Sequence, residues 1–416
     1  MGSLSQLMGM PNIYAVGTFV LSSFISYYSI PIIILIARMK HLVDTPDERK
    51  LHKKVIPTLG GIALYAAIAI SYSLFAGIET VQSMVHFTGA LAILFFVGLK
   101  DDILVISPYK KLAGQFLAAG IVMINGLYIT NLGGVLGIED IPFWLSVPLT
   151  LFTFIVVINA YNLIDGVDGL AGGIGVIASS AFGFWFLADG YTGTALLAFS
   201  LTGALVGFLW YNFSPASIFM GDTGSMLVGF ILAFLAVKFV EVNVSHEASG
   251  FLTNTAPVFA VAVLIVPLYD TLRVFIIRFM KGKSPFEPGR EHVHHQFLGM
   301  GMNHRGVALT LYAINLAFIL FVMIFPRMEV NTLLALTLGS TLLVFPTQFL
   351  KRRVLRLFGY RVAPKRNDNG VRLVKRQPAE LNFWVPAFEK GQDSHENGKG
   401  RGNKRNDEKE DKSLVS

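Results

Sequence analysis

Two aspartates and two asparagines occur within the eleven residues Asn159–Gly169, between hydrophobic stretches long enough to cross a bilayer. An acidic side chain at the centre of a bilayer costs roughly 2.5–3.5 kcal/mol, so Asp165 and Asp168 are expected to have a compensating partner. A divalent cation is such a partner, and oxygen ligands from Asp and Asn suit Mg²⁺ or Mn²⁺ rather than zinc. The three-residue spacing places both carboxylates on one helical face, which favours a shared site.

Three further polar motifs each follow another hydrophobic stretch: the pair Asp101-Asp102, the turn Gly221–Ser225, and the histidine segment, residues 288–295, which contains His292, His294 and His295. Adjacent carboxylates repel, which raises the pKa of one of them and suits a general base. Backbone amides at a helix start, as in the turn, can bind an anion. Mg²⁺ typically takes one or two protein carboxylates and completes its shell with phosphate oxygens and water. These residue types predict metal-assisted phosphoryl transfer from a pyrophosphate.

Each motif also has a structural interpretation, and these alternatives stay open. Asp101 and Asp102 fit a solvated loop at a helix end, and Gly221–Ser225 fits a helix-capping turn. The three histidines fit an exposed loop, or a zinc site without cysteine or a fixed fourth ligand. Asp270 and Arg273, near the end of a later hydrophobic stretch, are expected to pair with each other.

The composition places these motifs in a membrane protein. Hydrophobic residues make up 53% of the 416 residues and charged residues 15%, and the mean hydropathy is +0.58, which is typical of a polytopic membrane protein. Since a spanning helix needs about 20 apolar residues, the sequence predicts an all-α bundle of about eleven transmembrane helices. The hydrophobic runs are 12–37, 58–77, 85–99 (a short one), 110–129, 143–161, 168–188, 193–211, 222–240, 257–279, 307–326 and 330–350.

The basic residues predict how the bundle is oriented. They cluster after the first, third, ninth and eleventh runs, whereas residues 78–84, 130–142, 189–192 and 241–256 contain no Lys or Arg. By the positive-inside rule, the odd-numbered spans end in the cytoplasm, so the N-terminus lies outside and the C-terminus inside. All four polar motifs then lie on the cytoplasmic side. The chain has no cysteine, which excludes disulfides and thiolate metal sites.

Two zones are expected along the chain: a membrane domain, residues 1–350, with cytoplasmic active-site loops, and a basic cytoplasmic tail, residues 351–416. Residues 359–376 are predicted to form a hairpin, and the chain beyond about 390 is predicted to be disordered. The basic tail either attracts anionic lipid or only reinforces the topology. No folded basic domain is indicated, which excludes a nucleic-acid partner.

Together the motifs resemble the polyprenyl-phosphate N-acetylhexosamine-1-phosphate transferases over about residues 10–350. The resemblance rests on five segments: Pro57–Gly61, Asp101-Asp102, Asn159–Gly169, Phe219–Ser225 and His292–His295. It implies a multi-pass enzyme of the bacterial plasma (inner) membrane with a cytoplasmic active site. Such an enzyme transfers a sugar-1-phosphate from a UDP-sugar donor to undecaprenyl phosphate in the lipid bilayer and releases UMP. A homodimer is an open alternative to a monomer.

Carried over by position, the resemblance also implies roles for individual residues. The metal ligands are Asp222 and, as co-ligand, Asn162. Three aspartates receive catalytic roles, with the first as the base that deprotonates the lipid phosphate: Asp101, Asp102 and Asp165. The implied uridine contacts are Asp168, Asn212 and Phe219, and either Lys53 or Lys54 serves the nucleotide. Lys111 is the implied contact to the phosphates. The implied sugar-recognition loop contains Arg290, His292, His294 and His295.

The donor sugar and the course of the reaction leave alternatives. Val293 interrupts the run of three histidines that is usual in the peptidoglycan-type branch, so the segment resembles the branch that uses UDP-GlcNAc. UDP-GalNAc as donor and phospho-MurNAc-pentapeptide transfer are the alternatives within the family. Direct in-line attack is favoured over a phospho-enzyme on Asp101 or Asp102. An ion-coupled secondary transporter, a different class, would show inverted repeats and acids deep in its spans, and the sequence shows neither clearly.

Overall fold

The chain is almost entirely helical over the part that the structure, a computed structural model, describes: residues 11–40, 42, 56–77, 80, 84–244, 255–282, 291–345, 360–362 and 373–375. Lys54 and Arg290, both predicted to bind substrate, lie outside these residues, as does the tail beyond 375. The strands β1 (Tyr360–Val362) and β2 (Leu373–Lys375) pair in a two-stranded sheet, where the sequence predicts a hairpin.

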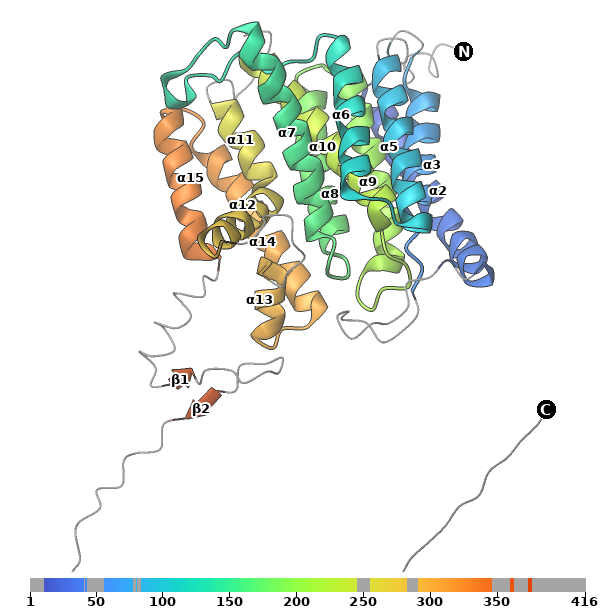
Figure 1. Ribbon diagram of the computed structural model, residues 1–416. Coiled ribbons are helices and arrows are strands. Elements are labelled where there is room, and N and C mark those ends of the chain that lie inside the picture. Colours follow the sequence, from blue (N-terminus) through green and yellow to red (C-terminus); the bar gives the residue numbers. More distant parts are fainter. Residues whose placement is uncertain are drawn as a thin grey trace, which may run out of the picture. The chain divides into compact units, whose positions relative to one another are not determined.

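Every predicted hydrophobic run coincides with a helix or, at 257–279, with two (Figure 1). Among the described residues, six helices are long and apolar enough to span a membrane, a bent pair makes a seventh, and α3 and α15 are shorter apolar helices. The all-α, multi-pass membrane fold is therefore confirmed, while the number of eleven spans stays a prediction. The helices are α2 (Pro11–Met39), α3 (Gly60–Phe75), α5 (Val85–Leu104), α6 (Pro108–Ile124), η1 (Val135–Gly137), α7 (Phe143–Ile164), α8 (Leu170–Ala188), α9 (Thr192–Asn212), α10 (Gly221–Val244), α11 (Ala256–Val263), α12 (Ile265–Met280), α13 (Val293–Gly299), α14 (His304–Ile324) and α15 (Val330–Val344).

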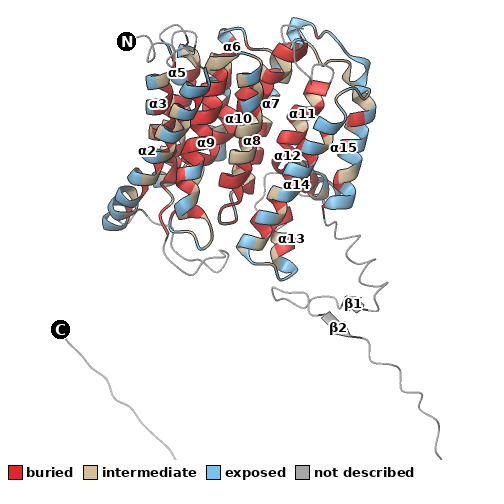
Figure 2. Cartoon of the chain, turned by 180° about the vertical axis from the view of Figure 1, so that it is seen from behind, coloured by how far each residue is buried: buried red, intermediate tan, exposed pale blue. Residues whose placement is uncertain are grey.

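Helix α10 forms the centre of the bundle. It is buried over 83% of its most apolar stretch, against 17% for α2, and it packs against α3, α5, α7 and α8. Figure 2 shows buried residues concentrated around α9 and α10 and exposed residues on outer helices such as α2 and α15. Helix α10 carries apolar residues on all of its faces, which is the pattern of a helix enclosed by other helices. Its first residues therefore lie among the ends of its neighbours.

The run 257–279, which the sequence predicts as one span, is divided into two helices, α11 and α12, which meet at 78°. In a continuous helix the ring of Pro267 would clash with the carbonyl of Val263, and Pro267 has no N–H to donate to that carbonyl. Asn315 on α14 donates to it instead, with Nδ2 3.2 Å from the oxygen. The freed polar group is thus satisfied among apolar helices, and α12 takes a new direction.

Candidate active site

Side chains from four helices meet at the end of the bundle that is lowest in Figure 1, where α5 leads to α6, α7 to α8 and α9 to α10. Lys111 Nζ on α6 lies 2.5 Å from Asp101 Oδ2 on α5 and 2.5 Å from Asp222 Oδ2 on α10. Asn162 on α7 donates from Nδ2 to Asp222 Oδ1 at 2.5 Å. These four residues and Asp102 are called the carboxylate cluster, and all five were predicted site residues.

Asp102 binds the first backbone amides of α10. Its Oδ1 accepts from the Asp222 N–H at 2.7 Å, and its Oδ2 accepts from the Thr223 N–H at 3.0 Å and from the Thr223 hydroxyl at 2.5 Å. The first amides of a helix have no partner within the helix and favour a negative charge, so Asp102 caps α10 from another helix. The anion that these amides bind in the structure is a side chain of the protein itself.

Two glycines allow the close backbone approaches on which the cluster depends. Gly221 has φ +73°, and a Cβ there would lie 2.0 Å from the Thr58 carbonyl oxygen. A Cβ on Gly98 would lie 2.4 Å from Thr223 Cα, so α5 and α10 are in contact without an intervening side chain. Any other residue type would push Asp102 away from the amides it caps.

The segment Pro57–Gly61 supports the turn before α10 through its backbone. The Phe219 N–H donates to the Pro57 carbonyl at 2.8 Å, and the Gly60 N–H donates to the Phe219 carbonyl at 3.0 Å. The next amide, of Gly61, donates to the Met220 carbonyl at 2.9 Å. Phe219, which was predicted to stack on uridine, is thereby fixed in its backbone and partly exposed.

Asp165 follows α7 directly and lies close enough to the carboxylate cluster to be affected by its charges. Burial raises the pKa of Asp165 well above its usual range, and the negative charges of Asp222 and Asp102 raise it further. Among the described residues Asp165 forms no salt bridge. A carboxyl group that is crowded by other carboxylates is stabilised in its charged form by a cation, so this position favours cation binding.

Asp168 joins the α7–α8 turn to two other segments. Its Oδ2 accepts from the Ala216 N–H at 3.1 Å, and its Oδ1 lies 3.2 Å from His304 Nδ1 at the start of α14. Burial by itself raises the pKa of Asp168, but the hydrogen bonds from His304 and Ala216 outweigh it and lower the pKa. Asp168 is therefore an ionised acceptor at the edge of the turn.

Asn212 is almost fully buried, with 3% of its surface exposed. Its Oδ1 accepts from the Gly169 N–H at 3.0 Å, and its Nδ2 donates to the Ile218 carbonyl at 2.9 Å. Both ends of the amide thus bind backbone and hold the α7–α8 turn against the α9–α10 loop. The predicted contact of Asn212 with uridine stays a prediction.

The histidine segment contacts the α7–α8 turn. His292 and His294 are buried, and a Cβ on Gly166 would lie 2.8 Å from His294 Nε2. Burial lowers the pKa of His294 to about 3, so this ring is neutral at physiological pH. Asp270, for which only a pairing with Arg273 was expected, binds the segment through both carboxylate oxygens.

The donor chemistry of the cluster fits a divalent metal that keeps most of its shell for substrate. No group of three or more His, Asp or Glu residues among the described residues is arranged to hold a metal by itself. Mg²⁺, however, requires only one or two carboxylates when phosphate and water complete its shell, and Asp222 and Asn162 provide such a pair. The ammonium of Lys111 between Asp101 and Asp222 shows that a cation is stable at this place.

Three residues of this region were missed as site residues in the sequence. Ser225 Oγ accepts from Asn162 Nδ2 at 2.7 Å, and the three-residue spacing from Asp222 could have indicated it. Thr223 binds Asp102 and stands inside the predicted turn. His304 is 136 residues away from Asp168 in sequence, and no local pattern indicates such a contact.

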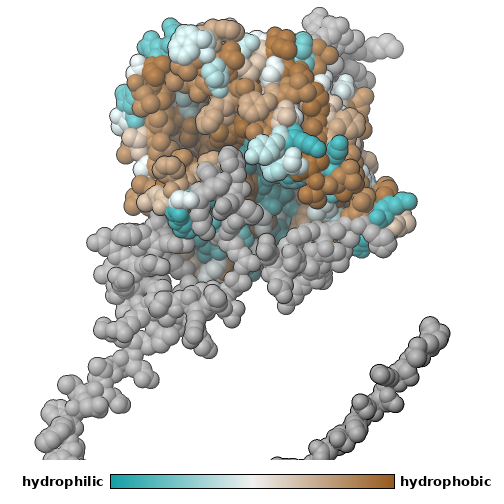
Figure 3. Space-filling model, in the orientation of Figure 1, coloured by the Kyte–Doolittle hydropathy of each residue, from teal (hydrophilic) through white to brown (hydrophobic). Residues whose placement is uncertain are grey.

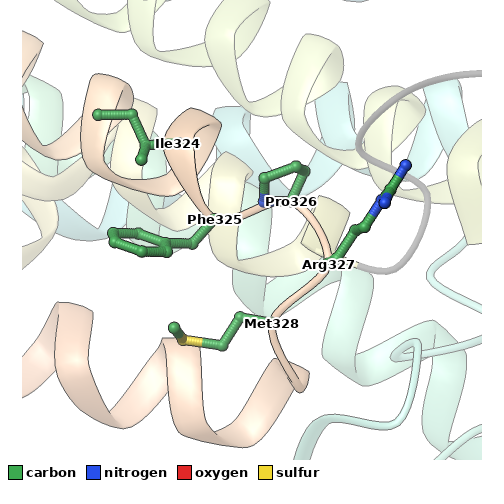
Figure 4. A pocket seen from close by; sticks show the side chains of 5 residues that line it. All are labelled: Ile324, Phe325, Pro326, Arg327 and Met328. Carbon is green, nitrogen blue, oxygen red and sulfur yellow. The ribbon is translucent and has the colours of Figure 1, made fainter.

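The surface also carries polar side chains near this end of the bundle. Figure 3 shows a hydrophilic region in the lower centre, between apolar surfaces of the helices. A shallow pocket in the α14–α15 turn (Figure 4) lies at the opposite end, because α14 runs from His304 beside Asp168 to this turn. Its lining contains one basic residue and no carboxylate, and so it offers no phosphoryl-transfer chemistry: Ile324, Phe325, Pro326, Arg327 and Met328.

Comparison with known proteins agrees with the site residues described above. The family model described as glycosyl transferase family 4 matches residues 84–240. The chain is 32% identical over 296 residues to a probable undecaprenyl-phosphate N-acetylglucosaminyl 1-phosphate transferase of Bacillus subtilis, covering 69% of this chain and 78% of that protein. It is 32% identical over 292 residues to an Escherichia coli K12 undecaprenyl-phosphate alpha-N-acetylglucosaminyl 1-phosphate transferase (68% and 76%). With a Mycobacterium leprae decaprenyl-phosphate N-acetylglucosaminephosphotransferase it shares 34% identity over 319 residues (70% and 78%). The motifs, the helical membrane fold and these relatives agree, and the chain belongs to glycosyl transferase family 4, among the polyprenyl-phosphate N-acetylglucosamine-1-phosphate transferases.

Proposed function

We propose that the protein transfers GlcNAc-1-phosphate from UDP-GlcNAc to undecaprenyl phosphate and releases UMP, the first membrane step of an envelope polysaccharide. An oxygen of the lipid phosphate attacks the β-phosphorus of the donor, and a new P–O bond forms. The bond from that phosphorus to the bridging oxygen breaks and UMP leaves. The meeting of Asp101, Lys111 and Asp222 at one end of apolar helices carries this proposal, and the names of the relatives support the substrates.

The carboxylate cluster supplies the groups that this reaction needs. Asp222 and Asn162 would hold Mg²⁺ or Mn²⁺, which would supply positive charge against the charge developing on the pyrophosphate. Asp101 accepts the proton of the lipid phosphate. Lys111 neutralises two carboxylates in the structure and contacts a phosphate oxygen as a point charge when substrate is bound. Asp102 keeps the start of α10 in place beside them.

The remaining predicted residues receive the donor. Asp168, Asn212 and Phe219 are assigned to the uridine, and Asp165 to the phosphates and sugar. The sugar loop comprises Arg290, His292, His294 and His295, and the contact of His294 with Gly166 supports its place beside the donor. GlcNAc is preferred over MurNAc-pentapeptide because the relatives' names specify N-acetylglucosamine. UDP-GalNAc is the second donor to test.

The proposal includes eleven spans in the bacterial plasma membrane, with the cluster and the C-terminus in the cytoplasm and the N-terminus outside. A long apolar acceptor then reaches the site laterally from the bilayer. Since the chain has no cysteine, single cysteines at Lys110 and Glu139 test the orientation. A membrane-impermeant maleimide should label Glu139→Cys in intact cells and Lys110→Cys only after permeabilisation, and the reverse contradicts the topology. A homodimer stays a prediction, testable by light scattering of the purified protein.

The activity is tested with the purified full chain, UDP-[¹⁴C]GlcNAc, Mg²⁺ and undecaprenyl phosphate. Labelled lipid should form, and EDTA or Asp222→Ala should abolish it. Glu139→Gln is the matched control and should retain full activity, because Glu139 is exposed and precedes α7, whose opposite end carries Asn162. If product formed only with UDP-GalNAc, the donor assignment would change to UDP-GalNAc. If no product formed with any UDP-HexNAc or with UDP-MurNAc-pentapeptide, the proposal would be overturned, and an ion-coupled transporter would be the remaining class.

A further inference from the structure

Asp270 on α12 contacts the histidine segment at His292 and Val293. We propose that Asp270 is a positioning residue that holds His292 in the tautomer with its proton on Nδ1, so that Nε2 offers a lone pair to a hydrogen-bond donor of the sugar. Such a donor is a hydroxyl or the acetamido N–H. The assignment of a sugar as ligand rests on the proposed function, whereas the tautomer does not.

Both carboxylate oxygens of Asp270 contact the histidine segment. Its Oδ2 lies 2.9 Å from His292 Nδ1, and its Oδ1 accepts from the Val293 N–H at 2.7 Å. Asp270 is 2% and His292 6% exposed, so the pair is shielded from water. A carboxylate only accepts hydrogen bonds, and the nitrogen that faces it must therefore carry the proton.

The other ring nitrogen is left for a ligand. His292 Nε2 forms no hydrogen bond with any residue that the structure describes. In the neutral ring with its proton on Nδ1, Nε2 is an acceptor only. The His292 ring stacks on His294 with centroids 5.5 Å apart, and His294 in turn contacts Gly166 in the α7–α8 turn. His292 is thus linked to the part of the site that carries Asp165 and Asp168.

Helix α12 fixes the backbone just before His292 as well. Arg273 donates to the Glu291 carbonyl at 2.6 Å, and the Glu291 carboxylate lies 3.5 Å from Arg278 Nε and 3.1 Å from Lys281 Nζ. These contacts hold the segment even without the His292 ring. A change at Asp270 that keeps the bond to Val293 should therefore alter the ring of His292 without releasing the segment.

Asp270→Asn is such a change. Its Oδ1 can still accept from the Val293 N–H, which turns the amide Nδ2 toward His292 Nδ1 as a donor. The imidazole must then accept at Nδ1 and carry its proton on Nε2. The His292 ring stays in place, while its Nε2 changes from a hydrogen-bond acceptor for the sugar to a donor.

Nitrogen NMR of the ¹⁵N-histidine-labelled full chain tests the tautomer directly, with the His292 signals assigned from their loss in His292→Ala. The wild type should show a protonated Nδ1 and an unprotonated Nε2, and Asp270→Asn should show the reverse. A wild-type protein with a proton on Nε2, alone or together with one on Nδ1, overturns the proposal, even where the variant does not fold. An unchanged tautomer in a folded Asp270→Asn also overturns it.

Kinetics test whether Asp270 acts through His292. Asp270→Asn should raise the KM for UDP-GlcNAc about tenfold, by analogy with the loss seen when the partner that orients a metal-ligating histidine is removed. It should leave the KM for undecaprenyl phosphate within about twofold. In the His292→Ala background the same change should have no further effect, because residues that act as a unit are not additive. Glu139→Gln should match the wild type. Additive effects, or equal rises in both KM values, would show a general structural role and refute the proposal. A wild type that is inactive with every donor refutes the proposed function and leaves the NMR result to decide the tautomer.

Discussion

Lys111 on α6 and Asp222 on α10 are 111 residues apart in sequence, yet Lys111 Nζ lies 2.5 Å from Asp222 Oδ2. The same ammonium lies 2.5 Å from Asp101 Oδ2, so one cation separates two carboxylates that would otherwise repel each other. The Lys111 ammonium thus contacts Asp222, the carboxylate that we propose as metal ligand. In the proposed mechanism, Lys111 and the metal are therefore alternative neutralising charges for Asp222.

Replacing Lys111 with Met should remove this neutralisation together with a phosphate contact. The turnover number should fall about 100-fold, which corresponds to about 2.7 kcal/mol of transition-state stabilisation. Lys111→Arg should not restore it, because the planar guanidinium does not replace a compact ammonium. Steady-state kinetics measure both. Lys110→Met, an exposed neighbour, is the control, and an equal loss in that variant would contradict the assignment.

Asp101 and Asp102 should separate into a catalytic and a structural carboxylate. Asp102→Ala removes the cap of α10 and should cost about 1–2 kcal/mol of stability, seen as a lower melting temperature as well as lost activity. Asp101→Asn should abolish transfer while the melting temperature changes less. Thermal unfolding in detergent, measured beside activity, compares the two. A stable, inactive Asp102→Ala would assign the chemistry to Asp102 instead.

Gly221→Ala should disrupt the turn through steric contact. A Cβ there would lie 2.0 Å from the Thr58 carbonyl oxygen, at φ +73°. Gly126 also has a positive φ, +88°, but nothing lies within 4 Å of its Cβ position, so Gly126→Ala carries the backbone strain without the clash. Thermal unfolding and transfer activity should both fall much further in Gly221→Ala. Equal effects would mean that strain alone explains the glycine.

Asp165→Asn should raise thermal stability at neutral pH in the presence of EDTA. Because burial raises the folded-state pKa of Asp165, its ionisation opposes folding. That cost is absent below the unfolded pKa of about 3.9 and grows as the pH rises toward the folded pKa. The gain in melting temperature should therefore be larger at pH 8 than at pH 5. A variant that is less stable than the wild type at pH 8 would contradict this account.

The local patterns of the sequence predicted much of the site. Apolar runs of spanning length located the helices. The polar side chains at their ends indicated three carboxylates and one carboxamide, which the structure brings together: Asp101, Asp102, Asp222 and Asn162. The apolar run 257–279 did not reveal its bend, because Pro267 allows either a kink or a break in a helix. The break is stabilised by Asn315, a residue 52 positions away from the carbonyl it binds.

The sequence by itself determined which residues could do chemistry and at which ends of the helices they stand, because apolar length and residue type are local properties. Only the tertiary structure decided their partners. Asp102 binds the amides of α10, Asp270 binds His292, and Asp168 lies beside His304. Each pairing depends on which helices pack side by side and how closely glycines such as Gly98 allow them to approach. The contact energies of residues far apart in the chain set that packing.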